Sequence, residues 1–376
     1  ASDIQNAYGP HTADPRTGEI LESDIGWYHN VMNLLRNWYL IQTAAVNEMS
    51  RSVKFKDEVM GELIRFVSAH EVGHTIGLPH NMGSSYAYPV DSLRSPNFTS
   101  NHGVAPSIMD YARFNYVAQP EDGVKNFYPR VGTYDIWSVK WGYTYFPDED
   151  KNSEKKILNS WIKNNANDYN YWFGYSNGID PRSQTESIGS DNMDASYYGL
   201  LNLKRIVPNL IDWSYEEGKN YEDLKELYMN VNNQFRRYIG HVTTNIGGIY
   251  EDLKSNDQEG SVYNHVPKNI QKKAIYFLNE HVFSSLDWLI DKNVLNKIEN
   301  IGAQERIRVI QNYALNRVFD YSRLSRMIEN KLINGNLSYS VQEMILDINK
   351  SIWGDLSNTN PIELYKRNLQ KSYVNI

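Results

Sequence analysis

Three histidines and one glutamate follow a spacing that suits metal chemistry. The stretch from His70 to His80 reads H-E-x-x-H-x-x-G-x-x-H. His70 and His74 are four residues apart, so on an α-helix their rings lie on one face, one turn apart, and can bind the same cation. Glu71 follows the first histidine, so its carboxylate can reach a water bound to that cation without being a ligand. The spacing predicts a metal site with a general base beside it.

The residues after His74 predict how a third ligand reaches the metal. Gly77 can adopt the left-handed conformation that ends a helix, and Pro79 keeps the helix from resuming. The resulting turn brings His80 towards the first two histidines. Three histidines and one water give a four-coordinate zinc with an open catalytic position, so we expect one catalytic Zn²⁺ ion. A structural zinc and a chance match are the alternatives, and the glycine and third histidine at fixed offsets disfavour both.

A helix must carry the first two histidines, and the sequence predicts it from about residue 57 to Ile76. Asp57 and Glu58 place negative charge in its first turn, which suits the helix dipole. Apolar and ligand residues recur at steps of three and four along one face: Val59, Leu63, Phe66, Val67, His70 and His74. A second helical pattern covers residues 31–46, and residues 19–27 alternate partly, as in a strand.

A second motif, Ser107-Ile108-Met109-Asp110-Tyr111, lies downstream of the histidines. Three histidines followed by such a methionine resemble the metzincin class of zinc endopeptidases. The resemblance implies that Met109 forms a turn beneath the metal. It also implies that Tyr111 can bind the metal or hydrogen-bond the reacting carbonyl, as in the astacin and serralysin branches.

The same resemblance implies an α+β catalytic domain. Its edge strand, along which substrate pairs, is expected at residues 18–28. The stretch 132–143 resembles the helix that closes metzincin domains, with Asp135 as a buried hydrogen-bonding partner under the methionine turn. Two features depart from the class: only some 55 residues precede the motif helix, and Asn81 after the third histidine matches none of the familiar branches.

The wider chain resembles large exported zinc metalloproteases, described only as uncharacterised proteins, of Bacteroides-like bacteria. The resemblance is carried mainly by residues 11–145, including DPRTGEI, HNMGSSYAYPVDSLRSP and APSIMDYARFNYVAQPEDG. It implies a secreted, periplasmic or cell-surface location. The chain opens on Ala1 with neither an initiator methionine nor a signal peptide. We therefore expect N-terminal domains of a longer precursor.

Beyond the motifs, the sequence predicts three regions. Residues 1–146 form the metzincin-like catalytic domain, residues 147–199 an irregular connecting region, and residues 200–376 a domain dominated by helical spacing. Four acids in or near the connecting region could bind calcium, although their spacing fits no standard loop: Asp180, Glu186, Asp191 and Asp194. Solvated surface acids are the alternative interpretation.

Composition limits the function classes. The 376 residues are 41% hydrophobic and 22% charged, as in an ordinary globular protein, and contain no cysteine. Disulfides and thiolate metal sites are therefore excluded. The net charge of −7 and the lack of a basic run argue against nucleic-acid binding. No apolar stretch of about 18 residues is present to span a membrane.

The sequence thus predicts a zinc-dependent endopeptidase acting on a protein or peptide substrate. Glu71 would accept the proton of the attacking water, and Tyr111 would hold the oxyanion. Two alternatives stay open: a zinc-binding surface module without proteolytic activity, and a peptidase limited to short peptides or its own precursor.

Overall fold

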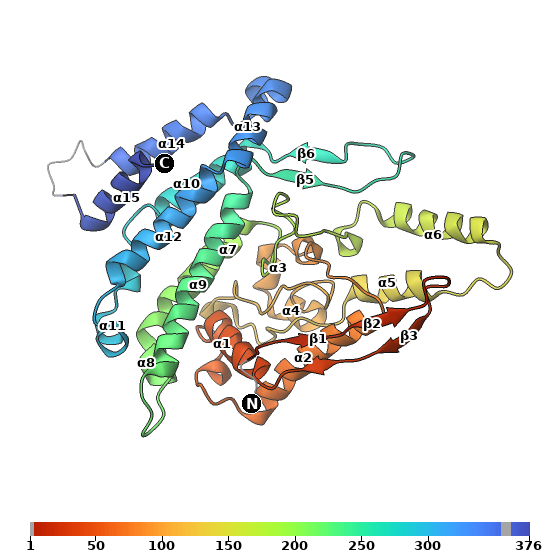
Figure 1. The fold of residues 1–376 in the computed structure, drawn as a ribbon, viewed down its shortest axis with the longest axis horizontal. Helices are drawn as coiled ribbons and strands as arrows, with labels where there is room; N and C mark the ends of the chain where they lie inside the picture. The colour runs from red at the N-terminus through yellow and green to blue at the C-terminus, as the bar shows by residue number, and fades with distance from the viewer. Residues whose placement is uncertain (1–3, 355–361) are drawn as a thin grey trace. The chain divides into compact units, whose positions relative to one another are not determined.

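In the computed structural model, which describes residues 4–354 and 362–376, the motif helix is α2, Asp57–Thr75 (Figure 1). Asp57 and Glu58 occupy its first turn, as predicted. The helix ends because Gly77 has a φ of 88°. Gly77 N donates to His74 O (2.9 Å) and Leu78 N to Gly73 O (3.0 Å), the two bonds of a Schellman motif. The predicted end of the helix at Ile76 is therefore confirmed to within one residue.

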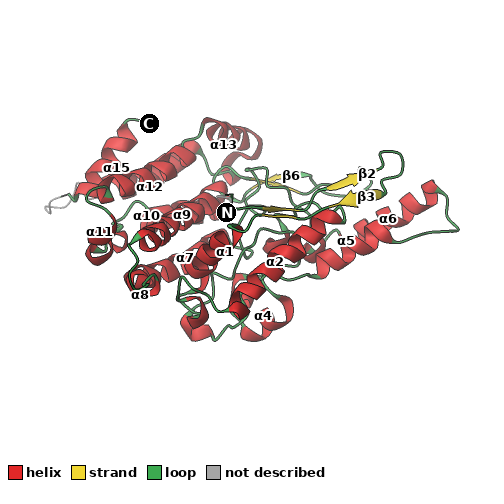
Figure 2. Ribbon diagram, turned by 60° about the horizontal axis from the view of Figure 1, so that its bottom comes forward, coloured by secondary structure: helices red, strands yellow, loops and turns green. Residues whose placement is uncertain are grey.

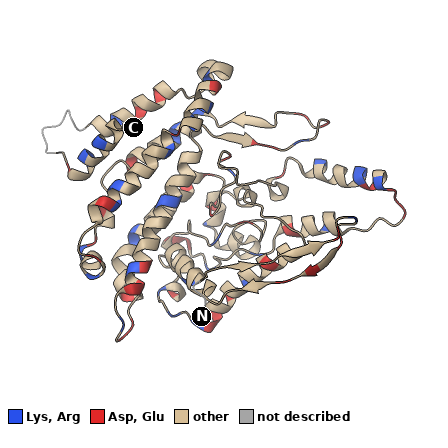
Figure 3. Cartoon of the chain, in the orientation of Figure 1, with Lys and Arg blue, Asp and Glu red and all other residues tan. Residues whose placement is uncertain are grey.

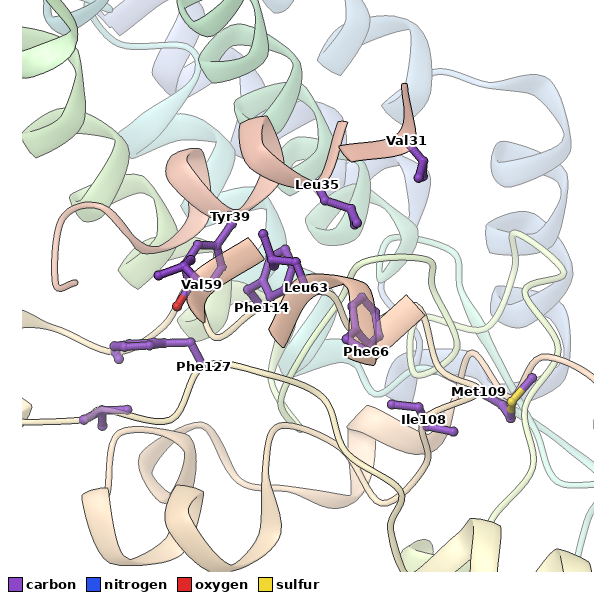
Figure 4. Packing of buried hydrophobic residues seen from close by; sticks show 12 residues of the cluster. Val31, Leu35, Tyr39, Val59, Leu63, Phe66, Ile108, Met109, Phe114 and Phe127 are labelled. Carbon is purple, nitrogen blue, oxygen red and sulfur yellow. The ribbon is translucent and has the colours of Figure 1, made fainter. Parts of the chain in front are cut away.

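Helix α1, Val31–Thr43, packs against α2 and forms the core beneath the motif. Figure 4 shows Val31, Leu35 and Tyr39 of α1 facing the side chains of α2, with Ile108 and Met109 in the same cluster. The complete buried cluster is Val31, Leu35, Tyr39, Val59, Leu63, Phe66, Ile108, Met109, Phe114, Ala118, Val124 and Phe127. The apolar steps of three and four on α2 thus bury one face and hold the helix in place.

The N-terminal residues form a bent hairpin along α2. Its strands are β1 (Ala7–Tyr8), β2 (His11–Ala13), β3 (Ile20–Ser23) and β4 (Gly26–Trp27). β1 pairs antiparallel with β4, and β2 pairs antiparallel with β3, with a register shift between Thr12 and Ala13. The strand expected at residues 18–28 is present as β3 and β4, while β1 is the strand that contacts α2.

Short helices connect these elements to the rest of the first compact unit, which comprises residues 1–177, 182–191 and 255–258. They are η1 (Glu48–Ser50), η2 (Ser84–Ala87), α3 (Val90–Leu93), α4 (Pro96–His102), η3 (Pro120–Asp122), α5 (Thr133–Tyr143), α6 (Lys151–Asn165) and η4 (Tyr169–Tyr171). α5 is the helix expected at 132–143. The stretch 147–199, expected to be irregular, contains the 15-residue α6, which begins where the Asp150 carboxylate accepts from the N–H groups of Asn152 and Ser153.

The second compact unit, residues 178–181, 192–254 and 259–376, is largely helical (Figure 2). Its elements are α7 (Asn192–Ile206), η5 (Val207–Asn209), α8 (Leu210–Trp213), α9 (Glu222–Thr244), β5 (Ile249–Glu251), β6 (Tyr263–His265), α10 (Lys268–His281), η6 (Asp287–Leu289), α11 (Lys292–Ile298), α12 (Ala303–Val318), α13 (Tyr321–Asn334), η7 (Gly335–Leu337), α14 (Val341–Trp353) and α15 (Leu364–Val374). The predicted helical patterns after residue 200 are therefore confirmed.

Helix α9 is the centre of this second unit, because α7, α8, α10, α11 and α12 all pack against it. Its stripe of Leu224, Leu227, Tyr228 and Val231 is buried. Acidic and basic residues are mixed along α9 and α12 (Figure 3). Near the end of α9, the Arg323 side chain donates to the carbonyl oxygens of Thr243 and Ile246, which lack helical partners.

The expected α+β class holds only in part. The protein is mostly helical, and strands of the described residues form just three two-stranded sheets, β1–β4, β2–β3 and β5–β6. The short N-terminal segment supplies one bent hairpin instead of a larger sheet. The boundaries at residues 146 and 199 stay a prediction, and residues 1–3 of the opening stretch lie outside the described part. No described helix combines the length and apolar character needed to cross a membrane.

Candidate metal centre

The rings of His70, His74 and His80 converge on one point. His80 Nε2 lies 2.9 Å from His74 Nε2 and 3.1 Å from His70 Nε2. One ligand atom from each of the three lies within 4.8 Å of the others. Nitrogens bound to one zinc at about 2.0–2.1 Å and tetrahedral angles are about 3.3 Å apart, so the observed spacing suits one small cation.

Backbone carbonyls orient two of the rings. His70 Nδ1 donates to Ile108 O at 2.7 Å, and His74 Nδ1 donates to Leu78 O at 2.9 Å. A carbonyl only accepts, so each Nδ1 carries the proton and each Nε2 keeps its lone pair for the metal. The turn that follows α2 therefore aims His74 as well as delivering His80.

Burial keeps two of the histidines neutral. It lowers the pKa of His70 to about 3, although the Ile108 carbonyl acts in the opposite direction. It lowers the pKa of His80 to about 4, with the nearby positive groups His74 and Arg113 adding to the effect. Metal ligands must be deprotonated, so these rings are ready to bind a cation at neutral pH. The donor set, three neutral imidazoles with oriented Nε2 atoms, fits zinc.

Glu71 lies beside the triad and is buried, with 6% of its surface exposed. Burial raises the pKa of its carboxyl, while His74 and a hydrogen bond from the Gly9 backbone N–H lower it. Gly9 approaches so closely that an added Cβ would lie 2.3 Å from Glu71 O. A glycine in the N-terminal hairpin is therefore required for its backbone to reach the carboxylate.

Tyr111 packs against two of the ligands. Its ring centroid lies 4.4 Å from that of His80 and 5.2 Å from that of His70. Burial raises the pKa of its hydroxyl, so the hydroxyl stays protonated at neutral pH and can donate a hydrogen bond. The structure thus brings Tyr111 together with Glu71 and the three histidines.

Met109 lies under the motif helix, fully buried. A Cβ added at Gly73 would lie 2.2 Å from Met109 Sδ, so this glycine lets the sulfur reach the helix backbone. Met109 O also accepts from Asn81 N at 3.1 Å, directly after the third ligand. The Asn81 side chain in turn donates to Trp172 O and accepts from Gly174 N. Asn81, which departs from the familiar metzincin branches, thus holds the loop at 172–174.

Asp135 at the start of α5 is buried and binds the segment that carries Met109. Its carboxylate accepts from Ser107 Oγ (2.6 Å), Ile108 N (2.8 Å) and Gly132 N (2.8 Å). Burial raises its pKa, and these hydrogen bonds lower it. Because Ile108 O receives the His70 proton, Asp135 supports the first ligand through one residue.

The four acids considered for calcium do not form a metal site. Among the described residues, the histidine triad is the one group of three or more metal-ligating side chains close enough to share an ion. Glu186 instead pairs with Arg113, Asp194 pairs with Lys273, and Asp180 accepts from Glu251 N. Acids scattered along an irregular sequence need the fold to gather them, and this fold gives these three other partners.

Arg113 is a residue of the site that the sequence reading missed. Its guanidinium lies 3.6 Å from the Trp38 ring centroid and 4.5 Å from that of Tyr111. Its Nε is 3.3 Å from Glu186 Oε1, and both side chains are largely buried. No spacing in the sequence links these partners, which are 75 residues apart or more from Trp38 to Arg113. Only the tertiary contacts could have identified the residue.

Two cavities adjoin the site within the first unit. One, of about 230 Å³, is lined by His70, Glu71, Tyr111 and Arg113, by Gln5, Asn6 and Ala7, and by Val31, Leu34, Leu35, Trp38, Phe66 and Val67. The other, of about 800 Å³, lies at the loop 76–79 and is lined largely by aromatic and aliphatic residues, including Tyr134, Trp137 and Trp141 of α5. Both are concave and mostly apolar, as peptide-binding subsites are.

Comparison with known proteins gives one match. A family model described as Met-zincin matches residues 52–360, which is more than half of the chain and includes the three histidines. The chain shows no significant similarity to a curated protein or to a solved structure.

Proposed function

Since the chain belongs to the Met-zincin family, we propose that it is a zinc-dependent endopeptidase that hydrolyses peptide bonds. The observation that carries the proposal is the cluster of three histidines with Glu71 beside it. A module that only binds zinc needs no general base at this position. The buried apolar cavities next to the triad favour a substrate with side chains, such as a peptide.

His70, His74 and His80 would hold the zinc through their Nε2 atoms. When bound, a zinc ion at such a site supplies Lewis acidity, which lowers the pKa of water to about 7 and polarises a carbonyl. Glu71 takes the proton from the attacking water and later delivers it to the leaving amine. Its raised pKa suits a group that must both accept and release a proton.

Tyr111 provides the hydrogen bond to the reacting carbonyl oxygen. Its hydroxyl is protonated and its ring is held beside His70 and His80. A donor placed where negative charge develops stabilises the transition state more than the bound substrate. Gly9, through its N–H, keeps the Glu71 carboxylate in one orientation.

The variant Glu71→Gln tests the proposal, with Glu62→Gln as a matched control on the exposed face of the same helix. We expect Glu71→Gln to retain one zinc per chain and to lose about 10²–10⁴-fold in casein cleavage. Glu62→Gln should change neither quantity. Native-like cleavage by Glu71→Gln would remove the role given to Glu71. Zinc binding by the native protein with no cleavage of any protein or peptide would favour the binding-module alternative.

A further inference from the structure

The smaller cavity opens directly beside the proposed reacting atoms. His70, Glu71 and Tyr111 all contribute to its lining, so a side chain in it belongs to a residue close to the scissile bond. Its volume of about 230 Å³ suits one side chain. Most of the remaining lining is apolar, from α1 and α2. The exception is Arg113.

Arg113 is held firmly in this lining. Its guanidinium lies over the Trp38 ring and over the Tyr111 ring, at 3.6 and 4.5 Å from their centroids. Such stacking on aromatic faces suits the planar arginine head group and fixes its plane. Glu186, which lies outside the lining, approaches Arg113 Nε at 3.3 Å.

The backbone is strained at both ends of this ion pair. Arg113 has a φ of 60° and Glu186 a φ of 64°, and they are the two non-glycine residues with positive φ among those described. Side chains disfavour this region, and residues held there cluster at functional sites. Glu186 N also donates to Tyr111 O at 2.8 Å, which ties the pair to the residue proposed to act on the carbonyl.

The charges around the cavity favour an acidic occupant. The titratable groups in its lining are His70, Glu71, Tyr111 and Arg113. Glu71 is committed to the reacting water, and the tyrosine and the ligand histidine carry no negative charge. A substrate side chain that enters displaces water from the guanidinium. A carboxylate replaces that water with charge-assisted hydrogen bonds, a lysine adds a like charge, and an apolar side chain offers no acceptor.

We propose that this cavity is a specificity pocket for an acidic side chain next to the scissile bond, with Arg113 as the specificity-determining residue. The proposal rests on the proposed endopeptidase function. A guanidinium can serve several acceptors at once, so its pairing with Glu186 is compatible with a second carboxylate from the substrate. The apolar walls favour glutamate, whose methylene groups they can contact.

The test uses the zinc-loaded protein and peptides that differ only at the two positions flanking the scissile bond. Glutamate, glutamine, leucine and lysine are placed at each position in turn, and kcat/KM is measured. For the position that enters the cavity, we expect the native enzyme to prefer glutamate over glutamine by about 10–100-fold, with lysine the poorest. Arg113→Gln should bring the ratio of glutamate to glutamine close to one.

Two further variants keep the result independent of folding. Arg113→Gln leaves Glu186 buried without its partner, so the double variant Arg113→Gln/Glu186→Gln removes both charges and should lose the acidic preference in the same way. Arg65→Gln removes an exposed arginine of α2 outside the cavity and should keep the preference.

Each outcome is decisive. Cleavage by the native enzyme without an acidic preference at either position would overturn the pocket assignment alone, as would an unchanged preference in both Arg113 variants. Failure of the native enzyme to cleave any peptide or protein would overturn the endopeptidase function, and the pocket with it.

Discussion

The site shows how environment divides roles among residues of the same chemical type. Glu71 and Asp110 are both buried carboxyls near the triad, but Glu71 receives the Gly9 N–H and lines a cavity, whereas Asp110 does neither. Asp110 is fully buried, and its Oδ2 accepts from Ser85 N at 2.6 Å. Burial raises the pKa of Asp110 to about 7, against the lowering effect of Ser85.

Asp110 should therefore make stability depend on pH. Its folded pKa lies above the unfolded value of 3.8. Its stabilising contribution is complete below pH 3.8 and is lost as pH rises through 7. Asp110→Asn removes the ionisation, so we expect it to raise the melting temperature more at pH 8 than at pH 5, by at most about 3 kcal/mol in the free energy of unfolding.

Thermal unfolding of the native protein and the variant at both pH values measures this difference. Asp148→Asn, at an exposed acid of the same unit, controls for the change in net charge. Equal shifts of the melting temperature at pH 5 and pH 8 would contradict the effect assigned to Asp110.

At the scale of elements, α2 and the segment around Met109 act as one support. Helix α2 provides two ligands, and Ile108 O orients the first of them. The segment is attached to α5 through Asp135 and through Tyr134 N, which donates to Pro106 O at 3.0 Å. α5 therefore supports the metal site without touching the metal.

Removing this attachment should weaken both the fold and the site. Asp135→Ala leaves Ile108 N and Gly132 N without their acceptor, which costs on the order of 3 kcal/mol. We expect a lower melting temperature together with weaker zinc retention in a competition with a chelator. Asp91→Ala, at an exposed first-turn acid of α3, is the matched control. An unchanged melting temperature and unchanged metal content in Asp135→Ala would refute the supporting role.

At the scale of the whole molecule, the family match at residues 52–360 includes residues of both compact units. The first unit contains every residue assigned to the site, and the second is built around α9. A ligand that binds only the folded chain stabilises it in proportion to the logarithm of its concentration above Kd. Zinc at the triad should therefore contribute to the stability of the protein.

Chelation should lower the melting temperature, and added zinc should restore it. A ligand at 100 times its Kd contributes about 2.7 kcal/mol, which is a shift of several degrees. His80→Gln should begin at a lower melting temperature and respond little to either treatment. Calorimetry with and without chelator measures the effect. If the native protein melts identically in both conditions, the triad does not hold a stabilising ion.

The sequence by itself determined the parts of the site that lie within a few residues of each other. The step of four between His70 and His74, the turn at Gly77 and the return of His80 follow from helix geometry and glycine conformation, which are local. The apolar periods of α1, α2 and the later helices are local in the same way. Tertiary structure alone decided which distant groups complete the site. Gly9 at Glu71, Ile108 O at His70, and Glu186 at Arg113 instead of calcium are contacts between segments 38 to 73 residues apart, and no spacing in a sequence encodes them.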